Sequence, residues 1–180
     1  MRRHFPWLTV MLLATLFCCA EARVSCAGAP SEYQIKGAYL YHFSKFVSWP
    51  DRAFDYEHQA FRLCILGEDP FGSLLLALTK KTVNKRKIAI VHLQPEQPFD
   101  GCHLLFIARS EQERWPDIHA TIRNQPILTV GDMPDFAQQG GMIHFFQSDD
   151  TLRFVINHRI LLQSGLKVDA ALLQIGQVIK

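Results

Sequence analysis

Acidic side chains follow two strand-like runs of the sequence, where they could bind a small ligand. Glu68 and Asp69 come directly after the apolar run 61–67, and Asp132 follows the apolar run 126–130 and a glycine. The carboxyl ends of parallel strands meet at one edge of an α/β sheet, and this edge is where such proteins bind ligands. These three carboxylates are therefore the candidate ligand cleft. For Asp132 the favoured alternative is that it caps a helix.

Motifs of the common enzyme classes are missing from the sequence. It contains no G-x-S-x-G, H-E-x-x-H, C-x-x-C, phosphate-loop or G-x-G-x-x-G pattern. No two histidines are spaced i, i+2 or i, i+4, so no local metal site is evident. We therefore predict a protein that is not an enzyme and that has no cofactor or metal. A site assembled from scattered His and Asp residues is the enzymatic alternative.

The first residues have the pattern of a signal peptide. Arg2 and Arg3 precede an apolar run over 5–20, and Ala20-Glu21-Ala22 has the spacing of small residues at a cleavage site. We expect a signal peptide over 1–22 that is cleaved near Ala22, a flexible tail over 23–30, and one domain over 31–180. A lipid anchor or an uncleaved anchor helix is a weaker alternative. The protein is thus expected to be exported.

The cysteines agree with export to an oxidising compartment. Cys26, Cys64 and Cys102 remain after this cleavage, so at most one intramolecular disulfide can form. Cys64 lies in a strand-like run, Cys102 opens another, and Cys26 lies in the expected tail. We therefore pair Cys64 with Cys102, with two buried free thiols as the alternative. Cys26 is left free or available to bridge two protomers.

The net charge and the length of the chain limit the kinds of partner and the number of domains that we expect. The formal net charge is +2 over 180 residues, and no basic stripe is present, so we expect no nucleic-acid partner. The weakly basic stretch 80–87 is interpreted as a solvated loop and an edge strand. The length suits one domain after removal of a signal peptide.

The elements that must position the candidate residues alternate in type. A first helix is expected to begin at a Ser31 cap and to end at Trp49-Pro50. Strands are expected over 61–67, 87–93, 102–108, 126–130, 142–146 and 152–156. Further helices are expected after Asp69, from a Ser110–Glu113 capping box to about Arg123, and over 135–138, 157–163 and 168–178. This pattern predicts an α/β fold, a single domain with a mixed sheet of about five to six strands and helices on both faces.

The first helix is unusually aromatic, which makes it a candidate docking surface. Its candidate partner-binding residues are Tyr39, Tyr41, Phe43 and Phe46, with Trp49 close by. Tyr, Trp and Phe are concentrated at protein interfaces. A helix whose aromatic side chains are all buried is an equally good alternative.

Several runs of the sequence, taken in order, resemble the YfiR-like family. The most specific is KGAYLYHFSKF over 36–46, followed by Trp49-Pro50. The others are CILG over 64–67 with DPF over 69–71, CHLLFI over 102–107, ILTV over 127–130, GGMI over 140–143, FVIN over 154–157 and LKVDAALL over 166–173. Together these runs cover essentially residues 32–179.

The resemblance implies a regulator in the periplasm. The family's best-known member binds and inhibits the periplasmic domain of an inner-membrane diguanylate cyclase, and a peptidoglycan-associated outer-membrane lipoprotein sequesters it. For this chain the resemblance thus implies a homodimer that controls cyclic di-GMP and biofilm formation. Cys64 and Cys102 match a family disulfide, whereas a second, more C-terminal one has no counterpart, because no cysteine follows Cys102. The alternative function is a periplasmic ligand-binding module that reports to a membrane sensor.

Overall fold

The computed structural model describes residues 30–94 and 96–179. The expected signal peptide, most of the expected tail and Cys26 lie outside the described residues. The described part contains the whole of the expected domain except Pro95 and Lys180.

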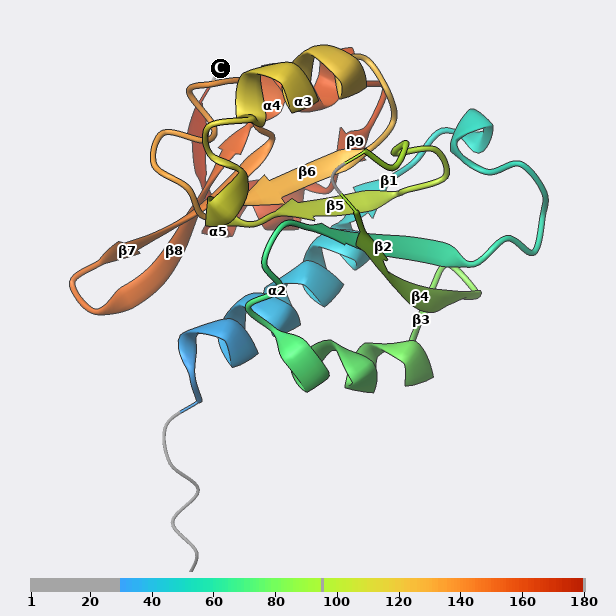
Figure 1. The fold of residues 1–180 in the computed structure, drawn as a ribbon, viewed down its shortest axis with the longest axis horizontal. Helices are drawn as coiled ribbons and strands as arrows, with labels where there is room; N and C mark the ends of the chain where they lie inside the picture. The colour runs from blue at the N-terminus through green and yellow to red at the C-terminus, as the bar shows by residue number, and fades with distance from the viewer. Residues whose placement is uncertain (1–29, 95, 180) are drawn as a thin grey trace, which may run out of the picture.

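A mixed sheet of eight strands forms the centre of the molecule (Figure 1). Its strand order is β10-β8-β7-β6-β5-β2-β4-β3. The strands are β2 (Phe61–Leu66), β3 (Thr82–Val83), β4 (Arg86–Leu93), β5 (Leu104–Ile107), β6 (Leu128–Gly131), β7 (Ile143–Ser148), β8 (Thr151–Asn157) and β10 (Gln177–Ile179). The pairings β3–β4 and β7–β8 are antiparallel and the others are parallel. The predicted α/β class and mixed sheet are confirmed, and the strand count exceeds the expectation because the short β3 and β10 extend the two edges.

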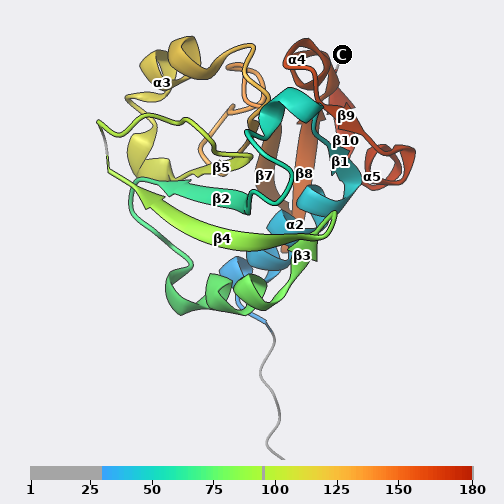
Figure 2. The same cartoon turned by 90° about the vertical axis from the view of Figure 1, so that its right-hand side faces the viewer.

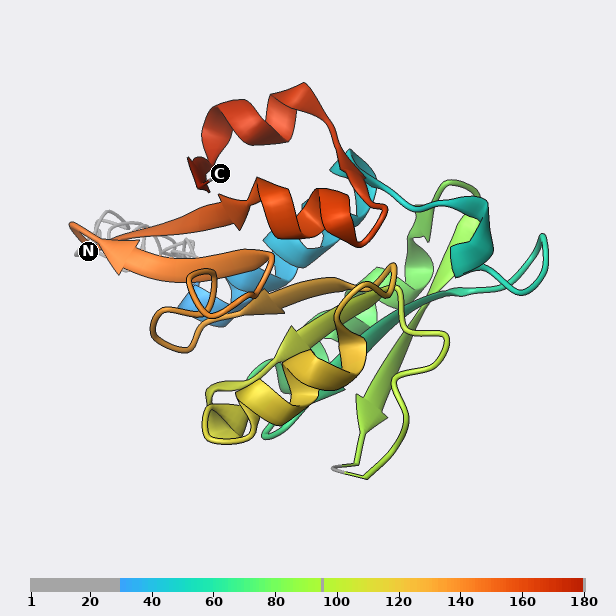
Figure 3. The same ribbon diagram turned by 90° about the horizontal axis from the view of Figure 1, so that it is seen from above.

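Helices cover both faces of this sheet (Figure 2). The α-helices are α2 (Glu32–Phe46), α3 (Trp115–Ile122), α4 (His158–Gln163) and α5 (Ala170–Ile175). The 3-10 helices are η1 (Asp51–Ala53), η2 (Gly72–Lys80) and η3 (Arg109–Glu111), and β1 (Val47–Ser48) pairs with β9 (Lys167–Val168) in a small separate sheet. Figure 3 shows α4 and α5 beside the β8 end of the main sheet.

The side chains of β2 alternate between the two faces of the sheet, and this explains why helices cover both faces. Leu63 and Ile65 belong to one buried cluster, which α2 and η2 cover, whereas Cys64 and Leu66 belong to a second cluster, which α3 covers. Successive side chains of a strand point to opposite faces of the sheet, so an unbroken apolar run is buried on both sides only when both faces are covered.

The predicted start of the first helix at a Ser31 cap is confirmed. Ser31 is the N-cap, and its Oγ accepts a hydrogen bond from the Gln34 backbone N–H at 3.3 Å. The Gln34 Oε1 in turn accepts the Ser31 N–H at 2.7 Å, which completes a capping box. The helix ends at Phe46, a little before Trp49-Pro50, because the next two residues pair with β9.

Two predicted helices have wrong bounds because contacts with residues distant in sequence engage part of each segment. The Ser110 hydroxyl accepts the backbone N–H of Glu68 at 2.9 Å instead of capping a helix, and α3 begins only after Arg114. The predicted helix over 168–178 is divided, since Asp169 caps the short α5 and the chain after Gly176 pairs with β8 as β10.

Two further helical predictions differ in type. The segment after Asp69 is the 3-10 helix η2 and not an α-helix, and residues 135–138 form turns. In η2 the side chains of Leu75 and Leu78, three residues apart, face the buried cluster. That spacing places both on one side of a 3-10 helix, which has three residues per turn.

A disulfide joins Cys64 in β2 to Cys102, which lies just before the adjacent β5. The two Cα atoms are 6.0 Å apart, and both side chains are buried. The bridge closes a loop with a sequence separation of 38 residues, which includes η2, β3 and β4.

Reducing this disulfide is expected to lower the free energy of unfolding by about 4 kcal/mol, because the unfolded chain gains the entropy of an open loop. Urea denaturation with and without a phosphine reductant measures the change. A Cys26→Ser variant should remain sensitive to reductant, whereas Cys64→Ala/Cys102→Ala should be insensitive. Equal midpoints for the wild type in both conditions would contradict the structural role of the bridge.

A buried histidine lies beside this disulfide. His103 is fully buried, and its Nδ1 accepts the Arg62 backbone N–H at 3.0 Å. Its ring stacks on Phe54 and Phe61 with centroid distances of 4.3 and 5.2 Å, and its Nε2 has no hydrogen-bond partner among the described residues. Burial lowers the pKa of His103 to about 4.

This burial makes the protein less stable in mild acid. The pKa of His103 is lower in the folded than in the unfolded chain, so the unfolded chain takes up the proton first as the pH falls. The contribution is complete above the unfolded pKa of about 6.5 and is lost as the pH falls towards 4, which amounts to about 2 kcal/mol between about pH 7 and pH 5.

His103→Asn retains an acceptor for the Arg62 N–H and should show a pH dependence weaker by that amount in urea denaturation. The comparison with wild type separates His103 from His119 and His144, whose pKa values burial also lowers. The same pH dependence in both proteins would exclude His103 as the cause.

Candidate functional site

The aromatic side chains of α2 divide between the core and the surface. Phe43 is completely buried and packs on Phe145 and Phe154, with ring centroids 5.5 and 5.0 Å away. Tyr39 is half-buried and contacts the same two rings. Phe43 is therefore a core residue, and its expected place in a docking surface is wrong, because the helix turns this side chain onto the sheet.

Tyr41 and Trp49 are both half-buried and pack against the same core. Trp49 Nε1 donates to the His103 carbonyl at 3.0 Å, and its ring meets Phe61 edge-on at 4.9 Å. Trp49 thus fastens the segment after α2 to the sheet. These contacts make Trp49 an anchor within the molecule.

An apolar groove lies between α2 and α5. Its volume is about 360 Å³, and its lining residues are Ile35, Ala38, Tyr39, His42, Phe46, Leu172 and Ile175. Phe46 is 36% exposed at one side and Ile175 is 67% exposed at the other. We call this the α2–α5 groove. Of the five expected partner-binding residues, Tyr39 and Phe46 line it.

The sequence did not reveal the α5 side of this groove, because residues 168–178 were expected to form one longer helix. The spacing of Leu172 and Ile175, three residues apart, is the signal for a shared face. Only the tertiary fold shows that Leu172 is buried and Ile175 is left open.

A buried ion pair joins α2 to the end of β6. Lys36 Nζ lies 2.6 Å from Asp132 Oδ2 and 2.5 Å from Glu32 Oε1, and the side chains of Lys36 and Asp132 are 2% and 3% exposed. Tyr33 OH donates to the same Asp132 Oδ2 at 3.0 Å. Burial by itself would lower the pKa of Lys36, but the hydrogen bonds to Asp132 and Glu32 outweigh it and raise that pKa. The lysine is therefore charged.

Asp132 does not cap a helix, because turns follow it. Its Oδ2 takes both hydrogen bonds, and its buried Oδ1 has no partner among the described residues. Asp132 also lines an open pocket of about 500 Å³, together with Arg109, Asp135 and His144. Burial lowers the pKa of His144 against the pull of the nearby carboxylates, which favours a neutral ring.

Glu68 and Asp69 belong to a different set of contacts. Asp69 Oδ2 lies 2.9 Å from His92 Nε2, and its Oδ1 accepts the Phe71 backbone N–H at 2.8 Å. The Glu68 side chain is exposed. Neither residue lines the pocket beside Asp132. The sequence predicts that the three carboxylates share one cleft. The structure instead divides them between two separate sets of contacts.

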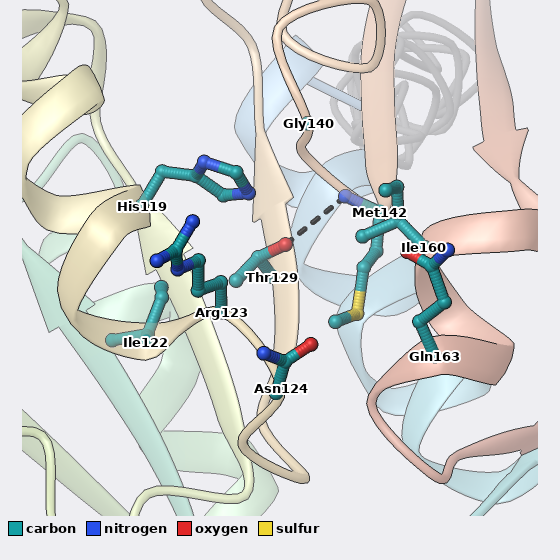
Figure 4. A pocket seen from close by; sticks show the side chains of 9 residues that line it. All are labelled: His119, Ile122, Arg123, Asn124, Thr129, Gly140, Met142, Ile160 and Gln163. Atoms are coloured by element: carbon teal, nitrogen blue, oxygen red, sulfur yellow. Dashed lines mark hydrogen bonds between the residues drawn. The ribbon is translucent and has the colours of Figure 1, made fainter.

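A second pocket lies where α3 and α4 approach the start of β6 (Figure 4). It measures about 230 Å³ and is lined by His119, Ile122, Arg123, Asn124, Thr129, Gly140, Met142, Ile160 and Gln163. Thr129 Oγ1 accepts the Met142 backbone N–H at 3.0 Å across it. No carboxylate lines this pocket, and nothing in the sequence spacing pointed to it.

Residues 30–94 and 96–179 contain neither a metal-binding cluster nor a membrane-spanning helix. No group of three or more His, Cys, Asp or Glu side chains in this part of the chain is arranged to hold a metal ion. Within the same ranges, no helix has both the length and the apolar character needed to cross a membrane.

Replacing Lys36 by Met is expected to cost about 3–5 kcal/mol of stability, because it leaves the Asp132 carboxylate buried without its cation. Lys45→Met, at an exposed lysine of the same helix, should change the stability by no more than about 0.5 kcal/mol. A Lys36→Met/Asp132→Leu double variant should recover much of the loss. Urea denaturation compares the three, and similar values for the two lysine variants would contradict the buried pair.

Comparison with known proteins places these features in a family. A family model described as YfiR/HmsC-like matches residues 33–177, which contain the α2–α5 groove, the disulfide and both members of the buried ion pair. None of the curated proteins compared with the chain matches it. YfiR-like proteins are regulators of the periplasm and not enzymes, and the disulfide fits that oxidising compartment. The chain therefore belongs to the YfiR/HmsC-like family.

Proposed function

We propose that the protein binds and inhibits the periplasmic domain of an inner-membrane signalling enzyme, a diguanylate cyclase, and thereby controls cyclic di-GMP and biofilm formation. Family membership supports a regulator with a signalling partner. The observation that carries the proposal is the α2–α5 groove, an apolar hollow beside the helix that bears the most specific family motif.

The groove has the properties of a docking site for an apolar side chain. Its tyrosine, Tyr39, is held in place by stacking on Phe43 with a centroid distance of 5.7 Å, and both are packed on the sheet. A rigid lining loses little conformational entropy when a partner binds. Covering an exposed Ile or Phe side chain contributes about 1.5–3 kcal/mol when its burial becomes complete.

A further exposed apolar side chain lies on the edge of the main sheet. Val178 in the edge strand β10 is 38% exposed, close in sequence to Ile175. We propose that a second copy of the chain, the cyclase and a peptidoglycan-associated outer-membrane lipoprotein all dock at the groove and so compete for it. Such competition supplies a means of regulation that does not need the second family disulfide, for which this chain has no cysteine after Cys102.

Ile175→Asp is expected to weaken binding to the periplasmic domain of the cyclase at least tenfold, because a charge would be buried in the apolar contact. Leu162→Asp is the matched control, since Leu162 is also exposed, at 51%, but does not line the groove. Calorimetric titration measures affinity, and a melting curve checks that each variant folds.

Tyr41→Ala adds a second comparison, because Tyr41 packs on the core and does not line the groove. It should lower the melting temperature and leave the affinity unchanged. An affinity that is unaffected by Ile175→Asp, or equally reduced by Leu162→Asp, would rule out the groove as the docking site.

A further inference from the structure

The 3-10 helix η2 exposes leucine side chains at the margin of the molecule. Leu75 is buried and Leu78 packs on the core, whereas Leu74 and Leu76, on either side of Leu75 in the sequence, are exposed. Leu76 is 61% exposed and Leu74 is 38% exposed. In Figures 1 and 2, η2 lies below β3 and β4 at the outer boundary of the fold. The described chain therefore leaves both leucine side chains partly open to solvent.

Positive charge adjoins these leucines. Lys80 ends η2 and Lys81 follows it, and both side chains are exposed. No Asp or Glu occurs in the sequence between Asp69 and Glu96, whereas residues 80–87 contain four lysines and one arginine. None of the four lysines takes part in an ion pair within the described residues.

The arginine of this run is already engaged. Arg86 lies over the Phe54 ring at 3.8 Å and donates to the carbonyls of Tyr56 and Gln59. Glu57 lines a pocket together with residues 84–87, so part of the charge at the β3–β4 turn has a counter-charge nearby. The cations free to meet a partner next to the leucines are thus Lys80 and Lys81.

We propose that Leu74, Leu76, Lys80 and Lys81, which we call the η2 surface, dock onto an anionic phospholipid bilayer. Leucines that enter the headgroup region, flanked by lysines that meet acidic headgroups, are the combination that binds membrane surfaces. A protein partner fits less well, because lysine is depleted at protein interfaces. Lysines alone would protect the edge strand β3 from pairing, but that role leaves the exposed leucines unexplained.

The η2 surface shares no residue with the α2–α5 groove. Docking on lipid would therefore leave the groove open and hold it close to a membrane-bound partner. The inference goes beyond the proposed inhibition and does not depend on it.

Vesicle sedimentation tests the proposal with the mature full chain. The protein should bind vesicles of phosphatidylethanolamine and phosphatidylglycerol at low salt and should not bind vesicles of phosphatidylcholine alone. Lys80→Gln/Lys81→Gln should weaken binding by about fivefold for each lysine. Leu76→Ser should weaken vesicle binding severalfold. This loss should depend less on the salt concentration than the loss caused by the lysine substitutions.

Matched controls lie elsewhere on the surface. Leu162→Ser changes a leucine of similar exposure on α4, and Lys45→Gln changes an exposed lysine of α2. Both should bind vesicles as the wild type does. Equal losses in these controls, or no binding of wild type to anionic vesicles at low salt, would overturn the proposal.

Two mixed results would also overturn it. If the lysine substitutions weaken binding while Leu76→Ser does not, the surface attracts polyanions in general and does not insert into lipid. If Leu76→Ser dissociates a dimer in sedimentation velocity and leaves vesicle binding unchanged, the leucines form a protein interface. The proposed cyclase binding at the groove is tested independently by the Ile175→Asp variant. Either proposal can therefore be contradicted without affecting the other.

Discussion

The packing of Phe43 between Phe145 and Phe154 holds the first helix against the late β7–β8 hairpin, and the other features of the surface depend on it. The contact joins residues more than a hundred positions apart and sets the rotation of α2 about its axis. With Phe43 directed at the sheet, Lys36 reaches Asp132 at the end of β6. The same rotation leaves Phe46 at the rim of the groove.

This arrangement explains how one helix can serve both stability and recognition. Its buried side contributes to the core and to an ion pair that is costly to break. Its flank, together with α5, forms a hollow that remains apolar and open. A regulator that acts by contact needs a surface of this kind on a rigid support, and the α2 core supplies that support.

Much of the fold could be predicted because its signals are local. Apolar runs identified six of the eight strands of the main sheet, and Ser31 identified the start of α2. The misplaced elements depend on contacts that are distant in sequence. Ser110 binds the backbone of Glu68, 42 residues away, and β10 exists only because β8 is there to pair with it.

The candidate site was predictable to a smaller extent. The pairing of Cys64 with Cys102 followed from two strand-like runs, which the structure places side by side. The aromatic stripe of α2 was visible, but sequence spacing could not separate the buried Phe43 from the exposed Phe46. Lys36 was missed as a buried cation because its partner is 96 residues away. The α5 side of the groove likewise exists only in the folded chain.

Hydrogen exchange of the protein alone and in complex with its proposed partner, the periplasmic domain of a diguanylate cyclase, tests the central claim most directly. The account predicts slower exchange in the complex over residues 35–46 and 172–178, with the region around the pocket of Figure 4 unchanged. Protection confined to α3 and the 140–142 loop, with none over α2 and α5, would contradict the assignment of the groove as the recognition surface.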